Sequence, residues 1–389
     1  MKTDVIIIGA GPSGLMLGHL LAQAGIESII LERKSGEYVL SRIRAGVLER
    51  GTIDIMSALG LDARLQREGL PHDRVTLADG ERLIHILVKE LTGKHVVVYG
   101  QTEVTRDLMD AAPERGVQII YEVNDVSLHD IESDTPFVTY QKDGEEHRVD
   151  ARFIAGCDGF HGPSRQAIPP SAASYIQKDY PFGWLGILAD VKPCSHEVVY
   201  ANHDRGFALA SMRSNTLSRY YVQVGLEEKL EDWSDDRFWE ELALRLGPEL
   251  ASNLATGPSI EKSITPLRSF VFETMRHGSL FLAGDAAHIV PPTGAKGLNL
   301  AASDIAYLAP ALIGFFKNKA STGIDSYAAK ALARVWKSSR FSWYLTSLMH
   351  RFPEGGDFGR KMQVAELSYI ADSRAAQTTI AENYIGLPL

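Results

Sequence analysis

The chain has 389 residues, of which 45% are hydrophobic and 23% charged, and this balance excludes a largely disordered or low-complexity protein. The length allows two or more domains, each with its own core. With 40 basic and 49 acidic residues the net charge is −9, which disfavours binding to nucleic acid or to an anionic membrane through bulk charge. An anionic ligand therefore requires locally clustered arginines.

Two cysteines, Cys157 and Cys194, are too few for a disulfide framework or a zinc site. We expect both to be reduced and structural, and we expect no metal. The chain enters a strand within a few residues of its start, so no signal peptide is expected, and no apolar run is expected to approach the roughly 18 residues of a membrane span. These features predict a cytoplasmic protein.

The first predicted strand, residues 4–8, leads into a glycine-rich loop and an apolar helix that ends near Gly25. A second strand, residues 28–31, ends in Glu32. This order is typical of a dinucleotide-binding fold, in which the glycines allow a tight turn and close approach of the pyrophosphate, and the acid binds the ribose. The expected cofactor contacts are Gly9, Gly11, Ser13, Gly14 and Glu32. Glu32 indicates an unphosphorylated ribose, hence FAD or NAD; a glycine turn without a nucleotide is the alternative.

Four cations follow within twelve residues: Arg33, Lys34, Arg42 and Arg44. A solvated helix face would explain such a run. Arginine also suits the geometry of phosphate oxygens, so we expect Arg42 and Arg44 to contact phosphate, either of the bound nucleotide or of a second, transient one.

Three further segments combine strands with turn signals. His72 lies in a turn context, Gln101 lies at the junction of a strand (95–100) and a helix, and residues 137–150 form a hairpin about Asp143-Gly144. Residues 152–165 run from a strand into glycines and Asp158, with a helix expected to start at Ser164. Asp158 is thus a carboxylate at the end of a strand.

Residues 279–304 carry a second strand-end carboxylate. A strand over 279–283 ends at Gly284-Asp285, where open α/β sheets bind ligands. Pro291-Pro292 predicts an extended elbow, followed by a loop and a helix over 298–309. A helix start favours negative charge. A reduced flavin fits, with Asp285 on its ribityl chain and the N–H groups of Leu298 and Asn299 near its pyrimidine edge; an unrelated α/β protein is the alternative.

Residues 180–224 show strands without intervening helices, which predicts a second, mostly antiparallel domain. If strands 207–213 and 219–224 pair about the turn 214–218, Arg213 lies opposite Arg219 and Ser211 opposite Tyr221, all on one face. Phe207 and Leu209 share that face. An arginine in apolar surroundings needs an anion, so a small aromatic carboxylate is expected there. An exposed sheet face with ordinary arginines is the alternative.

The predicted fold class is therefore α/β: an FAD-binding nucleotide fold of the glutathione-reductase type with an inserted, mostly antiparallel substrate domain. Helices are expected over 232–250 and 325–350, and the C-terminal region is expected to be helical. The predicted limits are 1–179 for the FAD domain, 180–270 for the substrate domain, 271–350 for a return to the FAD domain, and 351–389 for a C-terminal helical segment.

Three segments together, GAGPSG…E, GCDGFHGPSR and GDAAHIVPPTGAKGLN, resemble the group A flavin-dependent aromatic hydroxylases. Over essentially the whole chain the resemblance is to those members that act on 4-hydroxybenzoate. It is carried by RIRAGVLE, YGQTEVTRDLM, YPFGWLG, YANHDRGFAL, SMRS, SRYYVQV and TIAENYIGLP.

The resemblance implies a monooxygenase with tightly bound FAD that uses NAD(P)H and O₂ to hydroxylate 4-hydroxybenzoate at the 3-position, through a flavin C4a-hydroperoxide, to 3,4-dihydroxybenzoate (protocatechuate). It also implies a homodimer. Since no second GxGxxG exists, NAD(P)H must bind transiently. A related hydroxylase of another hydroxylated benzoate or phenol remains an alternative, as do a different flavoprotein on this fold and a flavin-bearing protein without turnover.

The resemblance also assigns residues. Ser211, Arg213 and Tyr221 hold the substrate carboxylate, and Tyr200 contacts the 4-hydroxyl and passes its proton through Tyr384 to His72, which is expected to titrate near neutral pH. The carbonyl of Pro292 accepts a hydrogen bond from the hydroxyl, and Asn299 steadies the flavin. Flavin positions are Arg44, Gln101, Asp158 and Asp285. Coenzyme positions are Arg33, Tyr38, Arg42, His161 and Arg268, with Arg44 in the same segment; Arg33 and Tyr38 favour NADPH.

Overall fold

The computed structural model describes residues 1–41, 46–80 and 82–389, so Arg42 and Arg44 lie outside the described residues. The chain begins with β1 (Val5–Ile8), whose four apolar residues are all buried. A continuous apolar run of this kind is typical of a parallel strand covered on both faces. It lies inside a six-stranded sheet.

Five of the six strands run parallel, and β18 pairs antiparallel with β19. In spatial order the sheet is β18 (Arg276–His277), β19 (Leu280–Leu282), β12 (Phe153–Gly156), β1, β2 (Ser28–Leu31) and β8 (Gln118–Ile120). The parallel pairing of β12 with both β1 and β19 brings their carboxyl ends to one edge. The predicted strands at 4–8, 28–31, 152–156 and 279–283 are confirmed.

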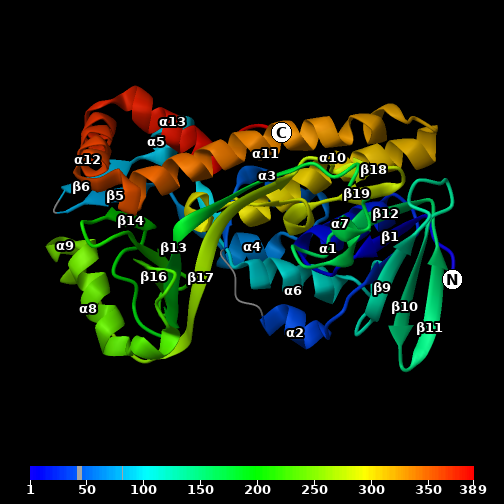
Figure 1. Ribbon diagram of the computed structural model, residues 1–389, viewed down its shortest axis with the longest axis horizontal. Helices are drawn as coiled ribbons and strands as arrows, with labels where there is room; N and C mark the ends of the chain where they lie inside the picture. The colour runs from blue at the N-terminus through cyan, green and yellow to red at the C-terminus, as the bar shows by residue number, and fades with distance from the viewer. Residues whose placement is uncertain (42–45, 81) are drawn as a thin grey trace.

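A second sheet has eight strands and joins segments that are far apart in the sequence. Its order is β20 (His288–Ile289), β17 (Ser259–Phe272), β13 (Tyr175–Ala189), β16 (Ser218–Val224), β15 (Ala208–Met212), β14 (Val199–Asn202), β5 (Val75–Asp79) and β6 (Arg82–Ile86). The long strands β13 and β17 cross the middle of the molecule side by side (Figure 1). The mostly antiparallel character of this region is confirmed; the domain limits stay predictions.

Each face of the eight-stranded sheet is buried against different helices. One face, with Ala208, Ala210 and Tyr220, packs against α8 (Asp235–Leu246). The other face, with Phe207 and Leu209, shares a core with α11 (Thr322–Met349), α12 (Gly356–Asp372) and α13 (Arg374–Ile385). Ser234 caps α8 by accepting a hydrogen bond from the Arg237 N–H, and Gly247 ends the helix at a positive φ of 83°.

The remaining strands form two small antiparallel sheets. The predicted hairpin is confirmed as β10 (Phe137–Lys142) and β11 (Glu145–Asp150), next to β9 (Asn124–His129). The other sheet is β3 (Val47–Leu48), β7 (Val96–Val98) and β4 (Leu70–His72). His72 is therefore the last residue of a short strand.

Helices complete the layers on both sheets, and Figure 1 shows α10 and α11 running along one side of the molecule. The α-helices not yet bounded are α1 (Pro12–Gln23), α2 (Gly36–Ser41), α3 (Arg50–Ala58), α4 (Ala63–Glu68), α5 (Val88–Thr92), α6 (Gln101–Ala111), α7 (Pro163–Gln166), α9 (Pro248–Ala251) and α10 (Gly297–Asn318). The 3₁₀ helices are η1 (Leu230–Asp232), η2 (Gly284–Ala286), η3 (Pro292–Gly294) and η4 (Pro353–Gly355).

Two predictions around the proline pair were wrong in detail. Pro291 is extended (φ −54°, ψ 139°), as expected, but Pro292 begins η3 instead of continuing the elbow. Helix α10 does not end near residue 309 but continues through Pro310 to Asn318. Packing of α10 against α1 and α11 outweighs the single backbone hydrogen bond that a proline removes.

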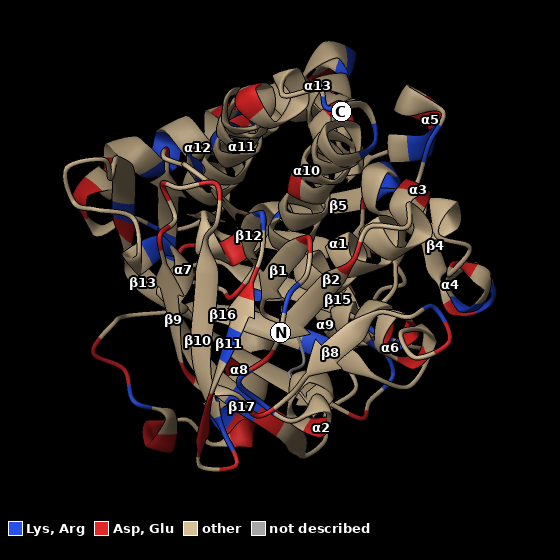
Figure 2. Cartoon of the chain, turned by 90° about the vertical axis from the view of Figure 1, so that its right-hand side faces the viewer, with Lys and Arg blue, Asp and Glu red and all other residues tan. Residues whose placement is uncertain are grey.

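The expectation about apolar runs also needs correction. By length and composition, α10 is apolar enough to cross a membrane, but 61% of its most apolar window is buried inside the protein. It is a core helix. Figure 2 shows Lys and Arg interspersed with Asp and Glu over the end of the molecule that carries the N-terminus.

Candidate functional site

The glycine loop after β1 has the geometry that a dinucleotide requires. Gly9 has φ +104°, and a Cβ there would lie 2.4 Å from the carbonyl oxygen of Cys157. At Gly14 a Cβ would lie 2.0 Å from the carbonyl oxygen of Gly9, whereas at Gly11 it would meet nothing within 4 Å. Gly11 also begins α1 without a side-chain cap. The loop therefore offers free helix-start N–H groups on an open side, which suits a pyrophosphate.

Glu32 holds this loop from the end of β2. Its two carboxylate oxygens accept hydrogen bonds from the N–H groups of Ala10 and Lys34, both at 2.8 Å. Ser13 is buried and interacts with the Cys157 thiol, whose pKa burial raises to about 12. Cys157 and Cys194 are both free and buried, as expected.

Gly9→Ala is expected to destabilise the protein and to lower its flavin content, because the backbone at φ +104° and the Cys157 carbonyl leave no room for a Cβ. The expected loss is about 1–3 kcal/mol of folding free energy, measured by thermal unfolding together with visible flavin absorbance. Gly11→Ala is the matched control, since its Cβ has space: it should unfold like the wild type without flavin and bind FAD more weakly. Wild-type behaviour of Gly9→Ala in both measurements would contradict the proposed loop.

The structure brings the two strand-end aspartates to one sheet edge, since Asp158 follows β12 and Asp285 follows the neighbouring β19. Asp158 accepts a hydrogen bond from the Ser164 N–H at 2.8 Å, while its buried Oδ1 has no partner among the described residues. Burial raises the pKa of Asp158. A ligand hydroxyl would satisfy this oxygen, so the edge fits a polyol chain.

Loop 284–288 is tied to α10 through a buried pair. Asp304 accepts hydrogen bonds from the Gly284 N–H at 2.8 Å and from His288 Nε2 at 2.6 Å. The neighbouring Asp304 carboxylate raises the pKa of His288 against the opposing effect of burial. This pair holds the segment that carries Asp285.

Asn299 locks the start of α10 to the rest of the fold. Its Oδ1 accepts from the Glu49 N–H at 2.9 Å and from Thr52 Oγ1 at 2.7 Å, and its Nδ2 donates to the carbonyls of Val47 and Ala295. The side chain is thus used within the protein. The N–H groups of Leu298 and Asn299 precede the first described backbone bond of α10, from Leu300 to Lys296. N–H groups at a helix start favour a negatively charged ligand.

Pro292 is exposed at the start of η3, and its carbonyl accepts a hydrogen bond from the Ala295 N–H at 2.9 Å. A carbonyl oxygen has two lone pairs, so one acceptor position is left for a phenolic hydroxyl. Thr293 Oγ1 accepts from Thr346 Oγ1 at 2.9 Å and ties η3 to α11.

The predicted register of β15 and β16 was wrong by two residues. Ser211 pairs with Arg219 and Leu209 pairs with Tyr221, while Arg213 lies in the turn and its N–H donates to the Leu217 carbonyl. The turn has the expected length but spans 213–217, one residue earlier than predicted. A shift of two preserves the face, since side chains alternate with period two. Phe207 and Leu209 accordingly share a core with Tyr200 and Tyr384.

The two arginines of this face differ in their partners. Arg219 donates to Glu261 at 3.2 Å and to the Tyr221 hydroxyl at 3.1 Å. For Arg213 the described residues provide no salt bridge, its Nε is buried without a hydrogen bond, and burial lowers its pKa against the effect of Tyr221. Among the described residues Arg213 thus has no salt bridge, and the Glu261 carboxylate that pairs with Arg219 acts on it only from a longer distance. Ser211 is buried beside it, with only a long contact of 3.4 Å to the Met212 carbonyl.

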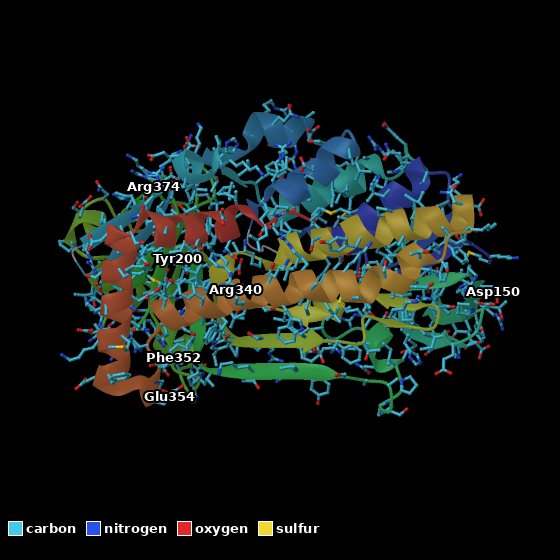
Figure 3. The ribbon with its side chains drawn as sticks, turned by 90° about the horizontal axis from the view of Figure 1, so that it is seen from above. Asp150, Tyr200, Arg340, Phe352, Glu354 and Arg374 are labelled. Atoms are coloured by element: carbon cyan, nitrogen blue, oxygen red, sulfur yellow. The ribbon has the colours of Figure 1, made fainter. Side chains whose placement is uncertain are left out.

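The predicted relay residues come from three separate elements: β14 (Tyr200), α13 (Tyr384) and β4 (His72). The rings of Tyr200 and Tyr384 lie edge to face, with their centroids 6.4 Å apart. Tyr200 lies at the same end of the molecule as Arg374 and far from Asp150 (Figure 3). Burial raises the pKa of Tyr200 to about 12 and that of Tyr384 well above its usual value. The Tyr384 hydroxyl acts on Tyr200 and partly offsets the rise in its pKa. However, the Tyr384 hydroxyl has no well-aligned hydrogen-bond partner among the described residues.

His72 differs from expectation. It is only 1% exposed, and burial, with the nearby His196, lowers its pKa to about 4, so the imidazole is neutral at neutral pH in this conformation. Glu197 contacts His72 and also contributes to the raised pKa of Tyr384. The Glu197 carboxylate therefore contacts the histidine and also acts electrostatically on the tyrosine.

Sequence reasoning missed a buried charge network beside Tyr384. Lys296 Nζ contacts Glu49 Oε1 and the carbonyls of Asn383 and Tyr384, and Arg334 donates to Glu49 Oε2 at 3.1 Å. Burial lowers the pKa of Lys296. In the sequence, the position of Lys296 inside the TGAKG loop could have indicated this network, whereas no pattern around Glu49 or Arg334 did so.

The structure brings two of the predicted coenzyme residues close together. Arg268 stacks on the ring of Phe160 at 5.2 Å, and His161 packs on the same ring at 5.1 Å. Arg33 and the half-exposed Tyr38 lie just before and within α2, where Lys34 stacks on Tyr38. Gln101 starts α6, as predicted.

Comparison with known proteins identifies the class. A family model described as FAD binding domain matches residues 2–342. The crystal structure of a p-nitrophenol 4-monooxygenase from Pseudomonas putida DLL-E4 superposes with a TM-score of 0.84 at 18% identity, covering 100% of both chains, which shows a shared fold. The chain belongs to this FAD-binding domain family.

Within that class the resemblance along the sequence is closer. A p-hydroxybenzoate hydroxylase of Acinetobacter baylyi (strain ATCC 33305 / BD413 / ADP1) is 56% identical over 389 residues, 100% of this chain and 96% of the relative. A 3-(3-hydroxy-phenyl)propionate/3-hydroxycinnamic acid hydroxylase of Mycobacterium sp. (strain JLS) is 25% identical over 84% of this chain and 56% of the relative. The chain is a member of the p-hydroxybenzoate hydroxylases, so the predicted fold class, family and enzyme class are confirmed.

Proposed function

We propose that this chain hydroxylates 4-hydroxybenzoate at the 3-position, with FAD as resident cofactor and NAD(P)H and O₂ as co-substrates. The observation that carries the proposal is Arg213, whose buried Nε has no hydrogen-bond partner and which has no salt bridge among the described residues, beside the apolar face that also holds Tyr200 and Tyr384. A benzoate supplies a carboxylate of the right charge and a ring that suits Phe207 and Leu209. The full-length identity to a p-hydroxybenzoate hydroxylase supports it.

The cofactor positions fit FAD. Glu32 and the loop from Gly9 to Gly14 would hold its adenosine and pyrophosphate, Asp158 and Asp285 its polyol, and the N–H groups of Leu298 and Asn299 its ring. Gln101 would complete the contacts, and Arg44 lies outside the described residues. When bound, FAD supplies hydride acceptance and O₂ activation.

The protein's own residues prepare the ring for attack. Arg213, Ser211 and Tyr221 anchor the carboxylate, and the Pro292 carbonyl and the Tyr200 hydroxyl hold the phenol. Removal of the phenolic proton raises the nucleophilicity of the ring carbon next to it. Because the pKa of Tyr200 is about 12, this tyrosine stays neutral and passes a proton by exchanging hydrogen bonds towards Tyr384 and His72. The buried core around the rings excludes water.

The test is flavin reduction and product analysis on the FAD-loaded enzyme. With 4-hydroxybenzoate we expect faster reduction by NADPH and one 3,4-dihydroxybenzoate per coenzyme oxidised. Benzoate, which has the carboxylate but no hydroxyl, should bind without product, and phenol should bind weakly. Reduction that does not depend on the aromatic ligand, or O₂ uptake without hydroxylated product, would favour a different flavoprotein.

Three finer points belong to the same proposal. NADPH is preferred over NADH, with Arg33, Tyr38, His161 and Arg268 as contacts, and the ratio of kcat/KM for the two coenzymes tests this.

The enzyme is a homodimer in the cytoplasm. Three exposed apolar residues of α11 and α12 support an interface: Trp343, Phe358 and Tyr369. Sedimentation would measure the oligomeric state. Activity on 3,4-dihydroxybenzoate tests whether a related phenol is the true substrate.

A further inference from the structure

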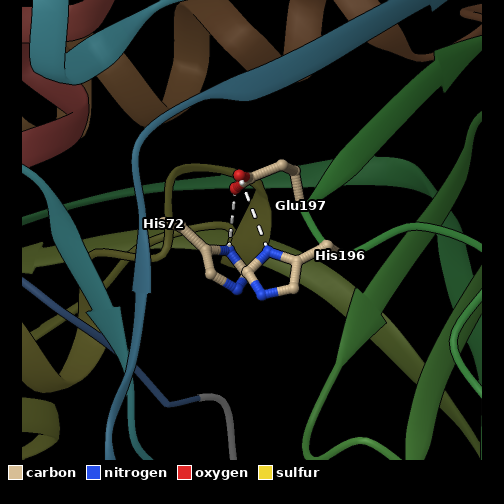
Figure 4. A group of neighbouring side chains, drawn as sticks. All are labelled: His72, His196 and Glu197. Atoms are coloured by element: carbon tan, nitrogen blue, oxygen red, sulfur yellow. Dashed lines mark ion pairs between the residues drawn. The ribbon is translucent and has the colours of Figure 1, made fainter.

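A cluster of two histidines and a glutamate lies beside the proposed relay. His72 is the last residue of β4, and His196 and Glu197 precede β14. His72 Nδ1 is 3.5 Å from Glu197 Oε2, and His196 Nδ1 is 3.7 Å from Glu197 Oε1. The carboxylate points between the two imidazoles (Figure 4). One donor atom from each residue lies within 4.8 Å of the other two.

The buried members of this cluster are not satisfied by the protein. Neither ring nitrogen of His72 has a hydrogen-bond partner among the described residues, and the buried Glu197 Oε2 has none either. His72 is 1% exposed and Glu197 is 8% exposed. Buried polar atoms are almost always paired with protein, water or an ion. The three unsatisfied atoms therefore indicate a ligand that the protein itself does not provide.

The donor chemistry favours a divalent transition-metal cation over water alone. Two imidazoles and a carboxylate are a known donor set for Zn²⁺, with bonds of about 2.0–2.2 Å, so adjacent donors around a tetrahedral ion lie about 3.4 Å apart. Each imidazole Nδ1 lies near this distance from one of the two carboxylate oxygens, at 3.5 Å and 3.7 Å, and all three donor atoms lie within 4.8 Å of one another. His196, whose side chain is 59% exposed, has the freedom to close the remaining distance. Two neighbouring charges also act on Glu197: Arg74 lowers the pKa of its carboxyl group and Asp73 raises it.

We propose that His72, His196 and Glu197 bind one divalent transition-metal cation of the Zn²⁺ type, with solvent as the fourth ligand. No metal was expected from the sequence, because two cysteines are too few for a zinc site. The second part of the inference rests on the proposed function: a neutral imidazole has one lone pair, so a His72 that coordinates the cation can no longer accept a hydrogen bond at the end of the relay. The cation is thus an inhibitor of the relay.

The test is calorimetric titration of Zn²⁺ into chelator-treated, FAD-loaded enzyme. We expect one Zn²⁺ per chain in the wild type and at least about 10- to 100-fold weaker binding in His196→Ala and in Glu197→Gln. His277→Ala is the matched control, because His277 also contacts a glutamate, Glu132 at 2.8 Å, outside the cluster; it should bind like the wild type. Equal affinity in the wild type and in both cluster variants would overturn the site.

The coupling to the relay has a separate readout. Saturating Zn²⁺ should lower kcat for hydroxylated product in the wild type, leave flavin reduction by NADPH unchanged, and have no effect on His196→Ala at the same concentration. Zn²⁺ that binds at the cluster without lowering kcat would refute the coupling. Hydroxylation of 4-hydroxybenzoate is measured first without Zn²⁺, so a failure of the proposed function is seen independently of metal binding.

Discussion

Arg213→Ala is expected to raise KM for 4-hydroxybenzoate by about 30-fold to more than 1,000-fold, which corresponds to about 2–5 kcal/mol for truncating one partner of a desolvated charge pair. The guanidinium has no salt bridge among the described residues, because the nearby Glu261 carboxylate pairs with Arg219, so the substrate carboxylate would be its direct partner. Steady-state kinetics and ligand titration of the flavin spectrum measure the effect.

Two controls make the Arg213 prediction specific. Arg50→Ala removes an exposed arginine that pairs with Asp54 on the surface, and it should leave KM unchanged. Phenol lacks a carboxylate, so its weak binding should be the same in the wild type and in Arg213→Ala. A KM increase below about threefold for 4-hydroxybenzoate would contradict an anion site at Arg213, and weaker phenol binding would indicate general damage to the pocket.

The parts of the fold that follow from local sequence were predictable. β1, β2 and the hairpin β10–β11 appear where apolar runs and the Asp143-Gly144 turn place them, because these signals lie within a few residues. The prediction that Phe207, Leu209 and Ser211 lie on the same face of the sheet was also possible, since side chains in a strand alternate strictly. The pairing register was not, because the position of the turn at 213–217 depends on the hydrogen bond from the Arg213 N–H to the Leu217 carbonyl.

The parts that depend on tertiary packing escaped prediction. The helix expected over 298–309 continues through Pro310 to Asn318, because it packs against α1 and α11. His72 was expected to titrate near neutral pH from its residue type alone, whereas burial sets its pKa at about 4. Glu49, Lys296 and Arg334 meet only in the folded chain. Burial and long-range contacts have no signature in a single sequence.

Tyr200→Phe is expected to leave 4-hydroxybenzoate binding nearly intact while lowering the rate of hydroxylation by roughly 100-fold or more, the scale of a lost general acid–base contribution. The change deletes one hydroxyl from a fully buried ring and leaves its contacts with Phe207 and Tyr384 in place. NADPH oxidation should continue, and the yield of 3,4-dihydroxybenzoate per NADPH should fall as hydrogen peroxide rises. Product analysis with coenzyme and peroxide assays measures the ratio.

The chain offers a matched control for Tyr200 on the opposite face of the same sheet. Tyr220 is also buried, but its hydroxyl accepts a hydrogen bond from the Cys194 N–H and its ring packs on Trp239, away from the proposed pocket. Tyr220→Phe should cost stability and leave the yield per NADPH unchanged, whereas Tyr384→Phe should lower the yield as Tyr200→Phe does. If Tyr200→Phe keeps the wild-type yield, the phenolic proton leaves by another route, and neither tyrosine belongs to the relay.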